Sequence, residues 1–348
     1  MAAGFFRPDA IFTRQKGRGI RLQTDSSKNV SMDENRRAWL FPLIFIAVIV
    51  IAFVVFNAVA GGKFLTFLNI KNIISHAVYP IFIAWGFCFL FACGYTDMSI
   101  GGVIVLGSFA ACALGNQIGV GGVVIGGMLV GFVLMFVNFL IFTYTKIPSW
   151  IAGISLALIY EAIAFALKTG KSTSSVVTSA LNSEYRLLGQ IPWSLVILAV
   201  GLVLVYLLYN RTNIGYNIRA IGGNKKVSQA MGINVNKTLL AVGIICGLLI
   251  GLACLMQESY AGQTSVKTGL TSINMIFQPL AIYLLPEIIQ KHINIIIGVP
   301  ICSVILYSVF NMLTIMKVPS GTLQEAFLGA FIIIFALIGQ HSVKGVVK

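Results

Sequence analysis

The sequence predicts an all-α polytopic membrane protein with about ten transmembrane helices. Of its 348 residues, 58% are hydrophobic and only 10% are charged, and the mean hydropathy is +0.93. That composition is too apolar for a soluble domain. Apolar runs of about 20 residues recur along the chain, the length that crosses about 30 Å of hydrocarbon. Because these runs are unbroken rather than short and alternating, a transmembrane β-barrel is excluded.

The spans follow a polar N-terminal segment. Residues 1–38 are basic, and they are too long and too charged for a cleaved signal peptide, so we predict a cytoplasmic tail. The predicted spans are 39–60, 72–93, 103–117, 121–144, 150–167, 193–210, 238–257, 273–285, 293–313 and 323–337. Together they make a transmembrane domain over 39–338, and 339–348 form a C-terminal tail. Pro279 and Pro286 are expected to break the eighth span.

The distribution of Lys and Arg predicts the orientation. An even number of spans places both termini on one side, and most of the 24 basic residues fall on that side. By the positive-inside rule, both termini are predicted to be cytoplasmic, although the N-terminal tail supplies much of the bias. The net charge of +14 is spread over tails and loops, so it indicates membrane topology and anionic lipid rather than nucleic acid.

The largest polar island inside the apolar region is 211–236, between the sixth and seventh spans. It contains no His, Cys or acidic residue. We expect a turn at Gly222-Gly223-Asn224, a short helix over Lys225 to Met231, and a helix stop at Gly232. Such a basic turn-helix-turn suits docking of a cytoplasmic partner, but it also fits an ordinary cytoplasmic loop.

Two acidic residues lie within the apolar region at places where a function is possible. Asp97 lies in a break bracketed by glycines, residues 94–102, where irregular backbone could line a cavity. Alternatively, Asp97 caps the next helix through the amides near Ser99 or Ile100. Glu161 either faces a polar path between the helices, pairs with a cation such as Lys168, or is an interfacial acid near a span end.

Other polar motifs do not indicate chemistry. Gly170-Lys171-Ser172-Thr173 imitates the end of a phosphate-binding loop, but Phe165 stands where the first glycine must be and no strand precedes it. The chain therefore lacks a P-loop of its own, and energy must come from elsewhere. The six cysteines lie in or beside apolar segments and are predicted to be core residues. Repeats such as Gly127/Gly131 and Gly243/Gly247/Gly251 predict close helix packing.

The polar island also carries a resemblance to a known family. Residues 215–224 (GYNIRAIGGN) and 230–235 (AMGINV) resemble the cytoplasmic coupling loop of the ribose-type (branched-chain amino acid/monosaccharide) permeases of bacterial ABC importers. In that family the loop carries a short helix that sits in a groove of the ATP-hydrolysing subunit. The residues that the resemblance assigns to ATPase coupling are Arg219, Gly222, Gly223, Asn224, Lys225, Lys226, Met231 and Gly232.

The resemblance implies a type II ABC importer-like permease in a bacterial plasma membrane. It implies three kinds of protein partner: ATP-binding cassette subunits, an extracytoplasmic solute-binding protein, and a second permease chain. No cofactor is expected in this chain, because ATP and Mg²⁺ would be used by the partner ATPase. The implied solute is a small polar molecule, a monosaccharide or related sugar, moved by alternating access.

Matches elsewhere give candidate residues for the translocation path. Residues 94–101 resemble the family's Gly-Gly-Ile-Asp-Leu-Ser-Val-Gly signature at Asp97, Ser99 and Gly101. Asn138 matches an Asn-Gly of the family, although a phenylalanine follows it here. Glu161 stands where relatives have a basic residue. We therefore assign Asp97, Ser99, Asn138 and Glu161 to the translocation path.

The resemblance covers 40–260 well and 320–338 weakly. In between, residues 277–286 do not match the family's Gly-Gly-Thr-Ser-Leu-Ser-Gly-Gly loop, which leaves the solute open. The alternative function is an ion-coupled secondary transporter that works without an ATPase. Asp97 and the prolines of the eighth span fit that alternative, but no repeat of one half in the other is visible. A membrane-embedded enzyme would need a cluster of His, Asp or Glu that the sequence lacks.

Overall fold

The computed structural model describes residues 47, 49–145, 147–169, 178–290, 292–319, 321 and 323–343. The predicted N-terminal tail, 1–38, and residues 344–348 lie outside this range. The chain divides into two compact units, Met1–Val55 and Phe56–Lys348. A helix covers Ile49–Val59, within the first predicted span. The fold described below is that of the second unit.

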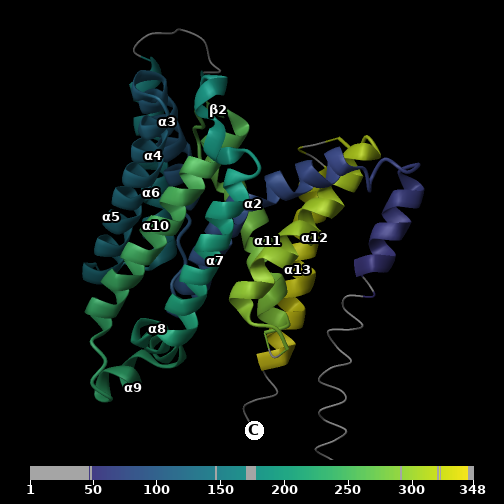
Figure 1. The fold of residues 1–348 in the computed structure, drawn as a ribbon. Coiled ribbons are helices and arrows are strands. Elements are labelled where there is room, and N and C mark those ends of the chain that lie inside the picture. Colours follow the sequence, from purple (N-terminus) through teal and green to yellow (C-terminus); the bar gives the residue numbers. More distant parts are fainter. Residues whose placement is uncertain are drawn as a thin grey trace, which may run out of the picture. The chain divides into compact units, whose positions relative to one another are not determined.

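Helices make up most of this unit (Figure 1). The long ones are α2 (Phe67–Ala92), α3 (Ile100–Ile118), α5 (Val130–Tyr144), α6 (Ser149–Thr169), α7 (Trp193–Arg211), α10 (Val235–Ala261), α11 (Asn274–Ile288), α12 (Ile295–Ile315) and α13 (Leu323–Val343). Two shorter ones, α8 (Asn213–Gly223) and α9 (Lys225–Ala230), connect α7 to α10. A short helix, α4 (Val120–Val124), and a π-helical segment, η1 (Ile125–Leu129), run into α5.

The described residues include seven helices that are long and apolar enough to cross a membrane. A helix is the favoured form for such segments because it satisfies every backbone polar group internally. Two shorter apolar helices, Ile49–Val59 and Leu323–Leu337, correspond to the first and tenth predicted spans. The polytopic helical class is confirmed, and seven of the ten predicted spans have the length to cross a bilayer.

The eighth predicted span differs from its expectation. Pro279 and Pro286 do not break it, because α11 runs without interruption from Asn274 to Ile288. A proline removes one backbone hydrogen bond, and neighbouring helices can hold such a helix together. Here α11 packs against α2, α12 and α13.

The core is built around α2 and α10. In the most apolar windows of these two helices, 83% and 72% of the residues are buried, whereas in α7 the share is 22%. α10 packs against α5, α2 and α3, so it is enclosed by helices that come earlier in the chain. α7 exposes apolar side chains along its length, including Val196, Val200 and Leu204. Such a surface is expected of a helix that faces lipid.

Glycines allow α10 to approach its neighbours closely. A Cβ added at Gly131 would lie 2.7 Å from the Cα of Gly251, and one added at Gly247 would lie 2.9 Å from the Phe132 ring. Gly243 is packed in the same way against Phe139. The predicted packing role of these glycines is confirmed, and it allows backbone-to-backbone contact where lipid provides no hydrophobic drive for helix association.

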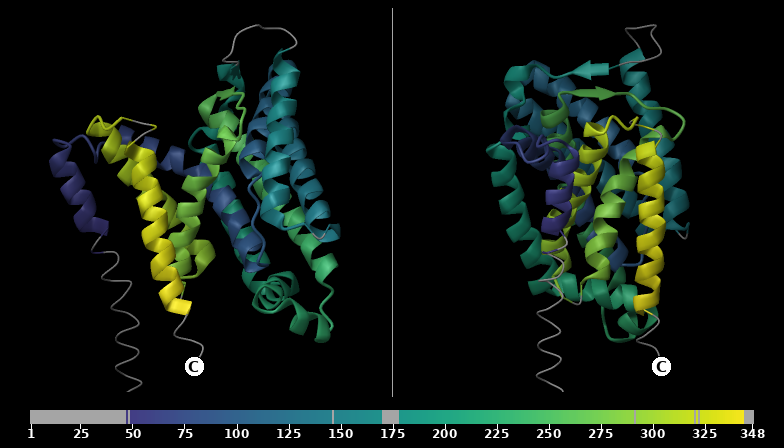
Figure 2. Two further views of the ribbon diagram at one scale, coloured as in Figure 1. Left: turned by 180° about the vertical axis from the view of Figure 1, so that it is seen from behind. Right: turned by 90° about the vertical axis from the view of Figure 1, so that its right-hand side faces the viewer.

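The two ends of α10 carry different structures (Figures 1 and 2). At its C-terminal end β2 (Gln263–Ser265) pairs antiparallel with β1 (Thr178–Ala180), and we call this the β-sheet end. Asn116 on α3 supports the same end, donating to the Ala180 carbonyl at 2.9 Å and accepting from the Asn182 amide at 3.0 Å. The N-terminal end of α10 follows α8 and α9, and we call it the α8–α9 end.

The packing predicts the effect of one substitution. Gly131→Val would place side-chain atoms against the α10 backbone, and the overpacking should lower the free energy of unfolding by about 1–3 kcal/mol. Gly121→Val is the matched control, because nothing described lies within 4 Å of a Cβ there. Thermal unfolding of the purified chain in lipid nanodiscs measures both. Equal melting temperatures would contradict the packing role.

Candidate functional site

The first helix of the α8–α9 segment, α8, packs against the helix bundle. Thr212 caps α8 by accepting a hydrogen bond from the Gly215 amide, and Ile218 and Ile221 are buried beneath it. Arg219 donates to the Tyr209 carbonyl of α7 at 2.7 Å, and its guanidinium lies 5.0 Å from the ring centroids of Tyr209 and Tyr216. Arg219 therefore fastens α8 to α7.

The predicted turn at Gly222-Gly223 is wrong. Both glycines belong to the last turn of α8, and the chain leaves helical geometry only at Asn224. The reason is contact with the bundle: a Cβ at Gly222 would lie 2.0 Å from the Ala92 carbonyl oxygen at the end of α2. Nothing described lies within 4 Å of a Cβ at Gly223. Gly222 is therefore the point where α8 rests on α2.

The short helix predicted at Lys225 is confirmed as α9. The Asn224 side chain accepts hydrogen bonds from the Lys226 and Val227 amides, both at 3.1 Å, which is an N-cap. At the other end, Gly232 has a φ of +87° and its amide donates to the Gln229 carbonyl, while the Ile233 amide donates to Ser228. These two bonds form a Schellman motif and confirm the predicted helix stop.

α9 presents a mixed apolar and basic surface. Met231 is 77% exposed and Val227 is 52% exposed, next to the exposed Lys225 and Lys226. Exposed apolar side chains next to charged ones are typical of a surface that binds another protein. The Nζ of Lys225 also lies 3.4 Å from the hydroxyl of Tyr95, which links α9 to the 94–99 connection between α2 and α3.

That connection leads to a buried polar cluster, formed by Asp97, Ser99, Asn138 and Tyr160. The Asp97 carboxylate accepts the Ser99 amide at 2.7 Å and the Asn138 side-chain amide at 3.1 Å. Asn138 also donates to the Ser99 hydroxyl. The Tyr160 hydroxyl donates to the Asn138 carbonyl oxygen at 2.6 Å, which closes the cluster against α6.

The cluster is shielded from solvent and closely packed. Asp97, Ser99 and Asn138 are fully buried, and Tyr160 is buried. Burial raises the pKa of the Asp97 carboxyl above its ordinary value, and the hydrogen bonds from Ser99 and Asn138 oppose that rise. Gly153 on α6 lies so close that a Cβ there would be 2.9 Å from the Asp97 carboxylate. The hydrogen bond that the Ser99 backbone amide donates to Asp97 agrees with the interpretation of Asp97 as a cap of the next helix.

Glu161 follows Tyr160 on α6 but binds a different segment. Its two carboxylate oxygens accept the backbone amides of Leu270 and Ser272, at 2.9 and 2.8 Å. Glu161 is 1% exposed, so its carboxylate is enclosed by the protein. The side chain of Lys168 lies outside the described residues. Glu161 thus anchors the connection between β2 and α11.

The structure brings three of the four predicted path residues together and separates the fourth. Asp97, Ser99 and Asn138 form one network, whereas Glu161 holds the 270–272 segment. Sequence reasoning missed Tyr160, although it lies seven residues after Gly153, two helical turns along the same face. Whether these groups line a path for solute stays a prediction. Among the described residues, no group of His, Cys, Asp and Glu could hold a metal ion.

These features define a class of protein: a multi-pass helical membrane protein with a structured connector, α8–α9, at one end of its bundle. Residues 69–336 match the family model described as the permease component of the branched-chain amino acid transport system. The match spans more than half of the chain, which therefore belongs to this family of permease components. Family membership supports an importer subunit and gives no support to the ion-coupled alternative.

Curated relatives are sugar permeases. The D-allose transport system permease protein AlsC of Escherichia coli K12 is 26% identical over 229 residues, which cover 65% of this chain and 69% of that protein. The ribose import permease protein RbsC of Haemophilus influenzae is 27% identical over 234 residues, covering 65% and 71%. The galactose/methyl galactoside import permease protein MglC of H. influenzae is 24% identical, covering 70% and 76%. No solved structure matches the chain significantly.

The polar cluster predicts a stability effect. Tyr160→Phe removes the donor to Asn138 in a buried site, and it should lower the free energy of unfolding by roughly 0.5–2 kcal/mol. Tyr144→Phe is the control, because Tyr144 is 68% exposed at the end of α5. Thermal unfolding in nanodiscs distinguishes the two. A Tyr160→Phe protein as stable as the wild type would show that the network contributes nothing.

Proposed function

We propose that this chain is the membrane-spanning subunit of an ATP-driven importer that takes up a monosaccharide or a related small polar solute. Membership of the permease family and the sugars named for its relatives support this proposal. ATP and Mg²⁺ would bind to separate ATP-binding cassette subunits. The single observation that carries the proposal within this chain is the exposed helix α9.

The coupling surface follows from the contacts of α8 and α9. α9 offers Val227 and Met231 to a partner, with Lys225 and Lys226 beside them. α8 behind it is fixed to the bundle by Arg219 and by the contact of Gly222 with Ala92. A force that the ATPase applies to α9 would therefore pass into α2 and the 94–99 connection, rather than being lost in a flexible loop.

The same proposal fixes orientation and assembly. The α8–α9 end carries Arg211, Lys225, Lys226 and Lys237, which favours the cytoplasmic side by the positive-inside rule. The β-sheet end then faces outward, where a solute-binding protein would deliver its ligand. Two copies of the chain, or this chain and a paralogue, would pair around the path. Alternating access follows when ATP binding favours one of two helix arrangements.

Co-purification of partner subunits, followed by a sugar-uptake assay, tests this function. The tagged chain, purified from membranes of its native host, should bring an ATP-binding cassette subunit with it. Proteoliposomes of that complex, supplied with the solute-binding protein, should take up radiolabelled D-ribose, D-allose, D-galactose or D-xylose only when ATP is present. Accumulation of solute by the chain alone, without nucleotide, would overturn the proposal.

The two glycines at the end of α8 predict opposite outcomes in that assay. Gly222→Val would drive a side chain into the Ala92 carbonyl and displace α8, so ATP-dependent uptake should fall at least tenfold while ATP hydrolysis continues. Gly223→Val is the matched control, with open space around it, and should keep uptake within about twofold of the wild type. Equal uptake by both variants would show that this contact does not transmit coupling.

A further inference from the structure

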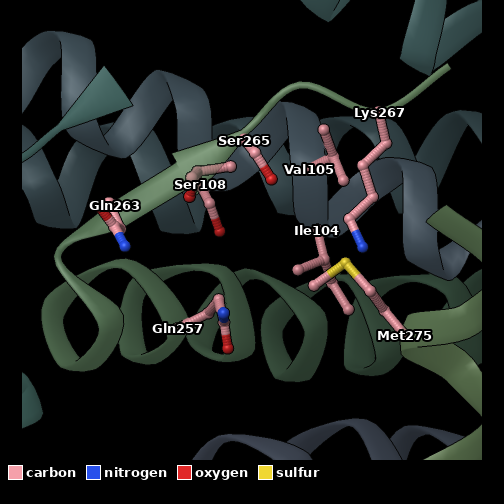
Figure 3. Close-up of a pocket in the computed structure, with 9 residues that line it drawn as sticks. Ile104, Val105, Ser108, Gln257, Gln263, Ser265, Lys267 and Met275 are labelled. Carbon is pink, nitrogen blue, oxygen red and sulfur yellow. The ribbon is translucent and has the colours of Figure 1, made fainter. Parts of the chain in front are cut away.

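A cavity of about 180 Å³ lies near the β-sheet end of the bundle (Figure 3). Its walls come from α3, α10, β2 and the first turns of α11. It is separate from the Asp97 cluster, none of whose members lines it. Nothing in the family match or in the names of the relatives assigns a role to it.

The walls divide into an apolar part and a polar part. The apolar side chains are those of Ile104, Val105 and Met275, and the polar ones are Ser108, Gln257, Gln263, Thr264, Ser265 and Lys267. In Figure 3 the side chains of Gln263 and Lys267 extend from the β2 segment toward α10. A small number of polar groups on an apolar wall is the usual composition of a small-molecule site.

The hydrogen bonding of the polar wall is incomplete. The side-chain oxygen of Gln257 is buried and has no hydrogen-bond partner among the described residues. That oxygen has no solvent-accessible surface, so it does not open onto the cavity, and the acceptors available to a ligand must come from other lining residues. The hydroxyls of Ser108 and Thr264 already donate, to the Cys254 carbonyl and the Glu258 carboxylate, and their remaining lone pairs can only accept.

The wall also has donors to offer. Lys267 contributes an ammonium group and Gln263 contributes a side-chain amide. A solute that both donates and accepts at several positions matches this mixture, as a hydroxyl-rich molecule does. Lys267 is the one charged residue on the described wall, and none of the lining residues is acidic. A cation would therefore find no counter-charge, and an anion would find only one.

We infer that this cavity is a binding site for a neutral, hydroxyl-rich solute of monosaccharide size. The inference rests on the proposed function and names a place for its substrate. The volume is below the roughly 300 Å³ at which sites for drug-sized ligands begin, so the ligand must be small. Ring carbons of such a solute pack against Ile104 and Met275, while its hydroxyls donate to the oxygens of Ser108 and Thr264.

Glu161 is a positioning residue for this site. It accepts the amides of Leu270 and Ser272, which lie in the segment between the lining residues Lys267 and Met275. The same segment presses on α3, because a Cβ at Gly101 would lie 2.1 Å from the Ser272 carbonyl oxygen. The segment that joins Lys267 to Met275 is therefore fixed by hydrogen bonds to Glu161 of α6 and by packing against Gly101 of α3.

Cysteine labelling tests the site directly. All six native cysteines are buried, so the S265C variant of the full-length chain introduces a thiol on the cavity wall with little background. In nanodiscs, D-ribose, D-allose, D-galactose or D-xylose should slow its reaction with a membrane-impermeant methanethiosulfonate at least threefold. S183C is the control, because Ser183 is exposed in the connection after β1, away from this cavity, and its labelling rate should not change.

A second arm measures affinity. Gln257→Leu replaces the polar end of a lining side chain by an apolar one of nearly the same size, and it should weaken stabilisation of the chain by the protecting sugar about tenfold in concentration. Gln190→Leu, at an exposed position outside this cavity, should leave the concentration dependence unchanged.

The outcomes separate this inference from the proposed function. Sugar uptake that depends on ATP, together with no sugar protection of S265C and an unchanged Gln257→Leu, would overturn the site and leave the importer standing. Stronger protection by D-ribose 5-phosphate than by every neutral sugar would overturn the neutral class. Failure of every sugar in both uptake and protection would remove the proposed substrate and this site together.

Discussion

The close approach of α10 to η1 and α5 is the constraint on which the rest of the molecule depends. Gly131 and Gly251 let two backbones come into contact, and Gly243 and Gly247 continue the contact along α10 toward its N-terminus. In hydrocarbon, packing rather than hydrophobic exclusion must hold helices together. Because α10 has 27 residues, about 40 Å at 1.5 Å per residue, it joins the α8–α9 end to the cavity at Gln257.

Three polar side chains organise connections between helices. Asp97 organises the passage from α2 to α3, Glu161 organises the passage from β2 to α11, and Asn224 starts α9. In each case a side chain accepts backbone amides that the neighbouring helices leave unpaired. A buried acid is costly unless its oxygens are satisfied, and Asp97 and Glu161 obtain such donors from backbone amides.

Most of the fold was accessible from the sequence, because apolar runs of span length allow few alternatives. The long helices from 67 onward, with Val120–Tyr144 taken as one span, begin and end within six residues of their predicted positions, whereas α8 was not predicted. What sequence patterns missed depends on tertiary contact. The pair Gly222-Gly223 is typical of a turn, yet Gly222 continues a helix because it must rest on Ala92. Glu161 has no partner nearby in sequence, since it binds amides about 110 residues away.

Residues 97–104, which lead into the first turns of α3, are in close contact with neighbours toward both ends of the bundle. Asp97 and Ser99 are bonded to Asn138, Gly101 is in contact with Ser272, and Ile104 already forms a cavity wall. A close-packed interior transmits a displacement instead of absorbing it. A shift of the 94–99 connection must therefore either move the 270–272 segment or break the hydrogen bonds that Glu161 accepts from it. The shape of the cavity and the position of the last turn of α2 are therefore coupled.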